Sequence, residues 1–157
     1  MTTGRIELGP TGRTVAANVK RLRAGRGLTL RALSTALKEH GRALSADALN
    51  KIENGAEPSD RGVRRVDVDD LMALAVVLNV SPLTLLLPYD AREQTDVTGA
   101  GTVEGVRAWE WALAKRPLSY PADADAEERS RHRALFELGS RAVGLRDRKP
   151  RDWGDDG

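Results

Sequence analysis

Side chains that can pair with the edges of DNA bases lie within seven consecutive residues of the sequence, from residue 45 to residue 51. They are Ser45, Ala46, Asp47, Asn50 and Lys51. Asparagine can form two hydrogen bonds with adenine, lysine can donate to guanine or to a phosphate, aspartate can accept from cytosine, and an alanine methyl can touch a thymine methyl. The alternative is that all five are solvent-facing residues of an ordinary bundle helix.

A second group of side chains can contact phosphates, which fixes a protein on a duplex without reading its sequence. These are Thr29, Arg31, Arg42, Arg61, Arg64 and Arg65. The charge distribution favours the same interpretation. Residues 1–88 contain 13 Lys and Arg against 9 Asp and Glu (net +4), and residues 89–157 contain 12 against 14 (net −2). A basic first part favours a polyanionic partner, although a solvated surface is the alternative.

The five residues that can contact base edges lie at the start of, or on, a predicted helix. Ser45 is its predicted N-cap, Leu49 and Ile52 form its apolar side, and Asn54-Gly55 ends it. Apolar residues at helical spacing and capping residues predict four further helices, at Thr14–Ala24, Thr29–Glu39, Asp67–Asn79 and Leu83–Leu87. Five helices with short connections predict a compact all-α domain.

The order of these segments carries a family resemblance. Leu28-Thr29 opens a scaffold helix with Leu33 and Leu37 inside, and Ile52-Glu53-Asn54-Gly55 closes a recognition helix that Ser45 opens. The runs Leu71-Met72-Ala73-Leu74-Ala75 and Leu78-Asn79-Val80-Ser81, followed by Leu85-Leu86, complete the pattern. Over about residues 14–88 the sequence resembles the Cro/repressor (XRE, or xenobiotic-response-element) family of helix-turn-helix proteins. The resemblance implies a five-helix lambda-repressor-like domain whose recognition helix enters the major groove.

Two segments depart from the family pattern. The connection between scaffold and recognition helices, residues 38–44, is several residues longer than the usual tight turn. The loop after Gly55 is also extended, by a basic stretch with Arg61, Arg64 and Arg65. A longer turn can change the angle between the two helices, and with it the docking geometry.

The rest of the chain is expected to be a short helical C-terminal extension. We predict a flexible arm over residues 1–13, the helix-turn-helix domain over 14–88, a linker over 89–101, a helical segment over 102–145 and a disordered tail over 146–157. The helical segment is expected to contain helices Val103–Lys115 and Ala126–Leu145. Its large apolar residues predict a dimer contact through Trp109, Leu113, Leu135 and Leu138, because helix-turn-helix proteins mostly read two half-sites as dimers. The alternative is that these residues pack on their own domain.

Other classes of protein have little support in the sequence. Cysteine is absent, and the two histidines, His40 and His132, have no ligand-spaced partner, so neither a metal nor another cofactor is expected. The sequence shows no glycine-rich phosphate loop and no nucleophile elbow, so an enzyme is not expected. We expect no membrane span and no signal peptide, and therefore a cytoplasmic protein. The sequence does not identify a small-molecule effector.

Two functions remain open from the sequence. The first is a sequence-specific transcriptional regulator, a repressor, that binds double-stranded operator DNA as a homodimer. The second is a helical protein-interaction module, such as a partner-binding adaptor or an antitoxin-like protein, that does not use the recognition face on DNA. The absence of Gln and Arg among the base-pairing residues and the long turn keep this alternative open.

Overall fold

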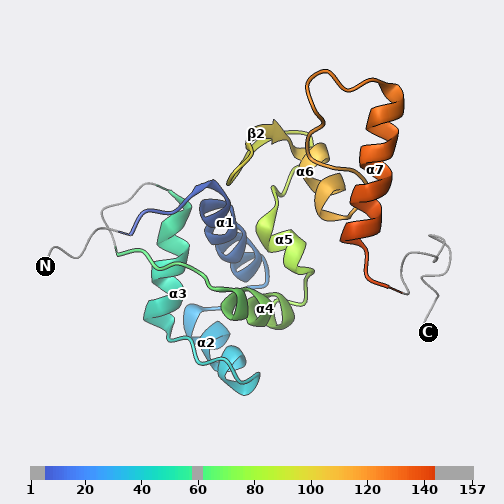
Figure 1. Ribbon diagram of the computed structural model, residues 1–157. Coiled ribbons are helices and arrows are strands. Elements are labelled where there is room, and N and C mark those ends of the chain that lie inside the picture. The colour runs from blue at the N-terminus through green and yellow to red at the C-terminus, as the bar shows by residue number, and fades with distance from the viewer. Residues whose placement is uncertain (1–5, 58–61, 144–157) are drawn as a thin grey trace, which may run out of the picture. The chain divides into compact units, whose positions relative to one another are not determined.

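The computed structural model describes residues 6–57 and 62–143 (Figure 1). The chain divides into two compact units after Gly105, and each is described by itself. Within the described residues the protein is mostly helical, with seven α-helices and one two-stranded sheet. The prediction of an all-α fold is therefore confirmed in its mostly helical character and corrected by this sheet, which it omitted. No helix in the described part of the chain is long and apolar enough to span a membrane.

The first unit contains five α-helices in the region where the sequence predicts five. They are α1 (Pro10–Gly25), α2 (Leu30–Glu39), α3 (Ala46–Glu53), α4 (Val68–Val77) and α5 (Pro82–Leu86), with a short 3-10 turn, η1, at Asn54–Ala56. In Figure 1, α1 lies between α3 and α5, and it contacts both of them. The second helix contacts α3 and α4, and α4 also contacts α5. Each of the five helices therefore contacts at least two others.

Side-chain caps begin four of these helices. Thr29, Ser45, Asp67 and Ser81 each accept a hydrogen bond from a backbone N–H in the first turn of α2, α3, α4 and α5. The first helix begins instead with Pro10, whose fixed φ and missing N–H suit the start of a helix. It therefore starts four residues before the predicted Thr14. Residues 10–13 belong to α1, and the prediction of a flexible arm over residues 1–13 is wrong for them.

One aliphatic core holds the five helices together. In the first unit, the aliphatic side chains with 0% exposed surface are Val19, Leu33, Leu37, Leu49, Ile52, Leu74, Leu78 and Leu85. They come from all five helices, so each helix buries one side against the same centre. Asn18 is also buried, and its Nδ2 donates to the carbonyl oxygens of Leu85 (3.1 Å) and Leu87 (2.8 Å), which holds the end of α5 against α1.

A β-hairpin interrupts the segment predicted as a linker, residues 89–101. Strand β1 (Gln94–Val97) pairs with strand β2 (Gly101–Glu104) in antiparallel register, with Gln94 opposite Glu104 and Val97 opposite Gly101. The linker prediction is therefore wrong over β1, and the predicted helical segment 102–145 begins inside β2. Each strand is only four residues long and mixes β-branched residues with Gln, Asp, Gly or Glu. Neither strand therefore forms the longer run of β-branched and aromatic residues that identifies a strand in a sequence.

The hairpin is fastened to the helices. The backbone N–H of Thr98 donates to Thr11 Oγ1 (3.0 Å), and the backbone N–H of Thr11 donates to Thr98 Oγ1 (3.3 Å). This reciprocal pair joins the hairpin turn to the first turn of α1. The hairpin is therefore part of the first unit and not a tether between units.

We expect Gly105→Ala to destabilise the hairpin. A Cβ at this position would lie 2.6 Å from the carbonyl oxygen of Glu93 and 2.8 Å from that of Ala91, and both of these are backbone atoms that cannot move aside alone. Overpacking of this kind lowers the free energy of unfolding by about 1–3 kcal/mol. Thermal unfolding followed by circular dichroism measures the change. Gly25→Ala is the control, because no atom lies within 4 Å of its added Cβ, and an equal unfolding temperature for the two variants would contradict the close approach.

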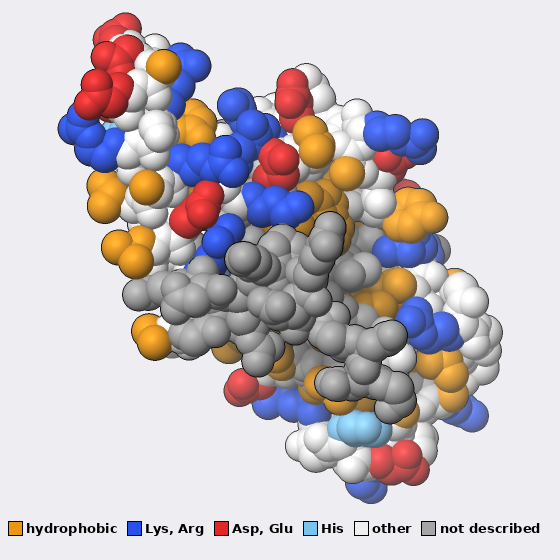
Figure 2. All heavy atoms as spheres, turned by 90° about the vertical axis from the view of Figure 1, so that its right-hand side faces the viewer, with side chains coloured by type: hydrophobic (Ala, Val, Ile, Leu, Met, Phe, Trp, Pro, Cys, Tyr) orange, Lys and Arg blue, Asp and Glu red, His pale blue; other side chains and the backbone are white. Residues whose placement is uncertain are grey.

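The remaining helices are α6 (Gly105–Ala112) and α7 (Ala126–Ser140). Both are shorter than the predicted Val103–Lys115 and Ala126–Leu145, and Leu145 itself lies outside the described residues. Ion pairs at i,i+4 spacing line α7, as between Arg133 Nε and Glu137 Oε1 (3.0 Å), and no residue of this helix is buried. On the face of the molecule drawn in Figure 2, basic and acidic side chains are interspersed, with apolar side chains between them. The predicted disordered tail, residues 146–157, also lies outside the described residues.

The four residues predicted to form a dimer contact lie on or next to these two helices. Trp109 lies on α6 and is partly buried, and Leu113 follows that helix and is exposed. Leu135 and Leu138 lie on α7 and are exposed, on neighbouring turns of the helix. Three of the four therefore present apolar surface outward within the described part of the chain. This exposure leaves them available for a partner, and dimerisation through them stays a prediction.

Candidate nucleic-acid interface

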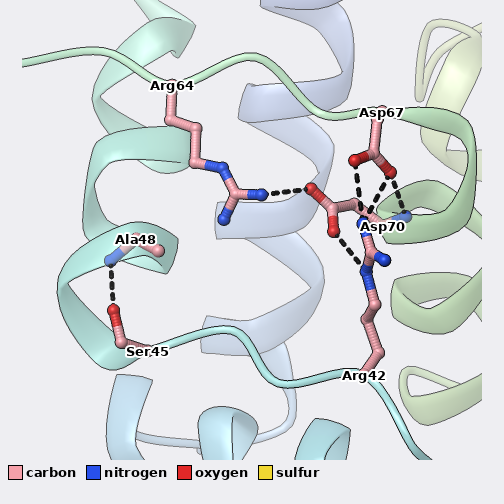
Figure 3. Close-up of polar contacts among 6 residues, drawn as sticks. All are labelled: Arg42, Ser45, Ala48, Arg64, Asp67 and Asp70. Carbon is pink, nitrogen blue, oxygen red and sulfur yellow. Dashed lines mark hydrogen bonds and ion pairs between the residues drawn. The ribbon is translucent and has the colours of Figure 1, made fainter.

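Helix α3 has one buried side and one exposed side. Ser45 Oγ accepts from the backbone N–H of Ala48 (3.0 Å) and so fixes the first turn (Figure 3). Leu49 and Ile52, three residues apart, have no exposed surface and face the core. The helix contacts α1, α2 and η1 through this buried side. The predicted recognition helix is therefore confirmed as a helix, with the predicted cap and the predicted core residues.

The five predicted base-pairing residues fall at the start and on the outer side of α3. Ser45, Asp47, Asn50 and Lys51 are exposed and Ala46 is partly exposed. Lys51 Nζ lies 2.8 Å from Asp47 Oδ2, an i,i+4 ion pair. An exposed pair of this spacing contributes about 0.3–0.5 kcal/mol, so a DNA base or phosphate can displace Asp47 from Lys51 at small cost.

The turn before α3 is long, as the sequence indicates. Residues 40–45 join α2 to α3, and Gly41 in this turn has a φ of +81°, a conformation that favours glycine. Ser34 Oγ donates to the carbonyl oxygen of Leu44 (2.5 Å), which holds the end of the turn on α2. Leu44 itself is buried in the core. The extra residues are therefore an ordered part of the first unit.

A buried carboxylate lies behind α3. Asp70 of α4 has 0% exposed surface, and two arginines bind it from different segments. Arg42 Nε, in the turn before α3, lies 2.7 Å from Asp70 Oδ1, and Arg64 Nη2, in the loop after α3, lies 2.8 Å from Asp70 Oδ2 (Figure 3). Arg42 Nη2 also lies 2.8 Å from Asp67 Oδ2. We call Asp70, Arg42 and Arg64 the Asp70 clamp.

Asp67 binds Arg42 of the clamp and also caps the start of α4. Its Oδ1 accepts from the backbone N–H of Asp70 (2.7 Å). This hydrogen bond, with the charge of Arg42 in addition, lowers the pKa of the Asp67 carboxyl below its usual value. A lowered pKa means that the folded state favours the charged form, so the stabilisation is present above the ordinary value and is lost as the pH falls through the lowered one. The hydrogen bond that Arg42 donates to the Asp70 carboxylate raises the pKa of Arg42.

The predicted phosphate contacts divide into two groups. Arg42 and Arg64 are partly buried and are engaged in the Asp70 clamp, so the structure gives them a structural role that the sequence did not predict. Thr29 caps α2 by accepting from the backbone N–H of Ala32 (3.1 Å), and it is exposed. Arg31 and Arg65 are also exposed, and Arg65 Nη2 donates to the carbonyl oxygen of Glu7 (3.3 Å). Arg61 lies outside the described residues.

A second ion pair joins the end of α3 to α1. Arg23 donates to the carboxylate of Glu53 through Nε (2.6 Å) and Nη2 (2.9 Å), and its Nη1 donates to the carbonyl oxygen of Leu28 (2.7 Å). Glu53 is buried, and its hydrogen bonds raise the pKa of Arg23. Sequence reasoning placed Glu53 only in the segment that ends the helix and did not identify this pair.

The sequence contains a signal for the buried position of Asp70. Three acids, at positions 67, 69 and 70, fall in the first turn of α4, and their charges suit the helix dipole there. Asp70, Leu74 and Leu78 are spaced four residues apart, so they share one face of the helix, and Leu74 and Leu78 face the core. A charged residue on a core-facing stripe indicates a buried partner of opposite charge.

The chain was also compared with known proteins. No family model, curated protein or solved structure matches it. Its function therefore has to be inferred from the outer side of α3 and the charges around it. Within the described residues no cluster of His, Asp and Glu could hold a metal ion.

Proposed function

We propose that the chain is a sequence-specific DNA-binding transcriptional regulator, a repressor, whose helix α3 lies in the major groove. One observation carries the proposal. Helix α3 buries Leu49 and Ile52 completely and presents Asp47, Asn50 and Lys51 outward. Only the major groove is wide enough for a helix and shows a distinct pattern of donors and acceptors for each base pair. The resemblance to the Cro/repressor helix-turn-helix family supports the same docking mode.

Each exposed residue of α3 has a role in this proposal. Asn50 reads an adenine through two hydrogen bonds, and Lys51 leaves Asp47 to donate to a guanine or to a nearby phosphate. Asp47 then accepts from a cytosine. Ser45 and Ala46, at the end of the helix that enters the groove first, contact a base edge and a thymine methyl.

Contacts with phosphates hold the helix in register. The first turn of α2 offers Thr29 together with Arg31, and a helix N-terminus attracts an anion through its free N–H groups and its dipole. Arg65, in the loop that follows α3, approaches the DNA phosphates. Arg42 and Arg64 are left out of this set, because their charges are already matched inside the protein by Asp70 and Asp67.

The regulator is proposed to act in the cytoplasm as a homodimer on double-stranded DNA. A dimer places two recognition helices on half-sites about one turn of DNA apart and so doubles the contacts. The exposed Leu113, Leu135 and Leu138, with Trp109, are the proposed dimer contact. The proposal involves no enzymatic step and no cofactor.

The salt dependence of binding tests this proposal. Three cations per protomer, Arg31, Lys51 and Arg65, give about six phosphate contacts for a dimer, and each contributes about −0.9 to the slope of log K against log salt. We expect a slope of about −5, measured by fluorescence anisotropy of a duplex selected from a random pool, between about 50 and 200 mM salt. A flat dependence, or no binding at the lowest salt, would contradict DNA binding.

The exposed surface of α4 favours a second candidate function, a protein-interaction module. Val68, Met72 and Val76 are spaced four residues apart and are all exposed, so they form an apolar strip on one side of α4. Contiguous apolar surface is typical of protein–protein contacts. In this case the outer side of α3 does not meet DNA, and the salt titration above gives the flat result.

A further inference from the structure

The Asp70 clamp holds both ends of α3. Arg42 lies three residues before Ser45, the cap that starts the helix, and Arg64 lies in the loop that follows it. The backbone N–H of Arg64 also donates to the carbonyl oxygen of Lys51 (3.1 Å), so this loop runs beside the last turn of α3. Both guanidinium groups meet the same carboxylate, one on each oxygen. A single buried side chain of α4 thus restrains the segments that enter and leave the helix.

Aliphatic packing by itself does not fix the pose of α3. Leu49 and Ile52 bury the inner side of the helix, but the hydrophobic effect is non-directional and tolerates small rotations and shifts. Hydrogen bonds between charged groups have a defined length and direction. A buried carboxylate that loses a partner is strongly destabilised, so both arginines are held to it. The contacts of the clamp, together with the ion pair between Arg23 and the buried Glu53, combine direction with a high cost of breaking.

We propose that Asp70 is a positioning residue for DNA recognition. It sets the angle of α3 through Arg42 and Arg64, and so determines which base pairs Asn50 and Lys51 reach. The inference rests on the proposed function. It gives Arg42 and Arg64 a role in sequence specificity, although neither touches a base. It also removes them from the phosphate contacts that their positions in the sequence predict.

The first test compares two variants that remove one charge from the same helix. Asp70→Asn keeps the volume of the side chain but leaves one oxygen instead of two, so one arginine faces an amide NH₂ group. Asp69→Asn is the matched control, because Asp69 is the exposed neighbour. For Asp70→Asn we expect affinity for the selected duplex to fall about ten- to a hundredfold, the range of one or two lost base pairings. Affinity for a scrambled duplex stays within about twofold of that of Asp69→Asn, because phosphate contacts persist.

The second test keeps the first falsifiable if Asp70→Asn unfolds. Arg64→Ala leaves Asp70 paired with Arg42, and the exposed neighbour Arg65→Ala is its control. The clamp predicts that Arg64→Ala loses affinity for the selected duplex only, with an unchanged salt slope. Arg65→Ala is expected to weaken binding to all sequences and to reduce the slope by about 1. The same uniform loss in Arg64→Ala would overturn the inference, since Arg64 would then be a phosphate contact.

Amide NMR spectra of the free protein separate this inference from the proposed function. In Asp70→Asn, or in Arg64→Ala, recorded where circular dichroism shows full helicity, the amide signals of residues 45–53 are expected to shift relative to those of the matched control. Unmoved signals would overturn the clamp even if the protein binds DNA. If the unaltered protein binds no duplex at low salt, the proposed function fails, whereas displaced signals still support the control of α3 by Asp70.

Discussion

A double variant, Asn50→Ala with Lys51→Ala, is expected to lose most of its preference for the selected duplex. The two side chains are exposed in the free protein, so their removal leaves the core intact. Each lost base pairing is expected to reduce discrimination by about 1–3 kcal/mol. Competition binding with the selected duplex and single-base-pair variants of it measures this loss and shows which positions have become tolerant.

The control for this variant is Lys115→Ala, which removes an exposed charge from the second unit. We expect it to leave the preference for the selected duplex unchanged. A double variant that binds every duplex more weakly by the same factor would show that Asn50 and Lys51 contact phosphates only and read no base. A double variant with unaltered discrimination would show that α3 does not read bases.

Leu49→Ala is expected to lower the free energy of unfolding by about 2–5 kcal/mol, because it removes a fully buried side chain and leaves a cavity. That is a large part of the 5–15 kcal/mol typical of a whole domain. The loss acts where α3 meets the core, so DNA binding is expected to fall with the folded fraction. Urea unfolding followed by circular dichroism measures the change.

The matched control is Val76→Ala, an apolar truncation at an exposed position of α4. Its effect is expected to stay within about 0.5 kcal/mol. If Leu49→Ala unfolded at the same urea concentration as Val76→Ala, Leu49 would not face the core. The exposed side of α3 would then have to be assigned again.

Local signals in the sequence were sufficient to predict α3. Ser45 as a cap, and Leu49 and Ile52 at a spacing of three, act within one or two turns, and they appear in the structure as predicted. The predicted stop at Asn54-Gly55 differs, because the chain continues through Gly55 as η1 and this glycine is buried. The start of α1 was missed, although Pro10 is a residue that favours a helix start. The hairpin was missed for another reason: its pairing joins residues across a turn, and its four-residue strands mix β-branched residues with Asp, Gly and Glu, which are depleted in strands.

The Asp70 clamp shows where sequence reasoning reached its limit. Arg42, Arg64 and Asp70 come from three segments, and no rule of local spacing brings them together. From the sequence alone, arginines in loops beside a recognition helix indicate phosphate contacts. Only the structure shows that a buried acid lies next to two of them. The exposed α3 residues involve no such long-range partner, so their positions were predicted correctly while their role on DNA stays a prediction.

The most direct test of the proposed interface is an amide NMR titration of the protein with the selected duplex at low salt. We predict that the signals of Ser45, Asp47, Asn50 and Lys51 shift or broaden first, with those of Thr29 and Arg31, while the exposed α4 residues Met72 and Val76 stay unchanged. A titration in which the α4 signals respond and those of α3 do not would contradict the placement of α3 in the major groove.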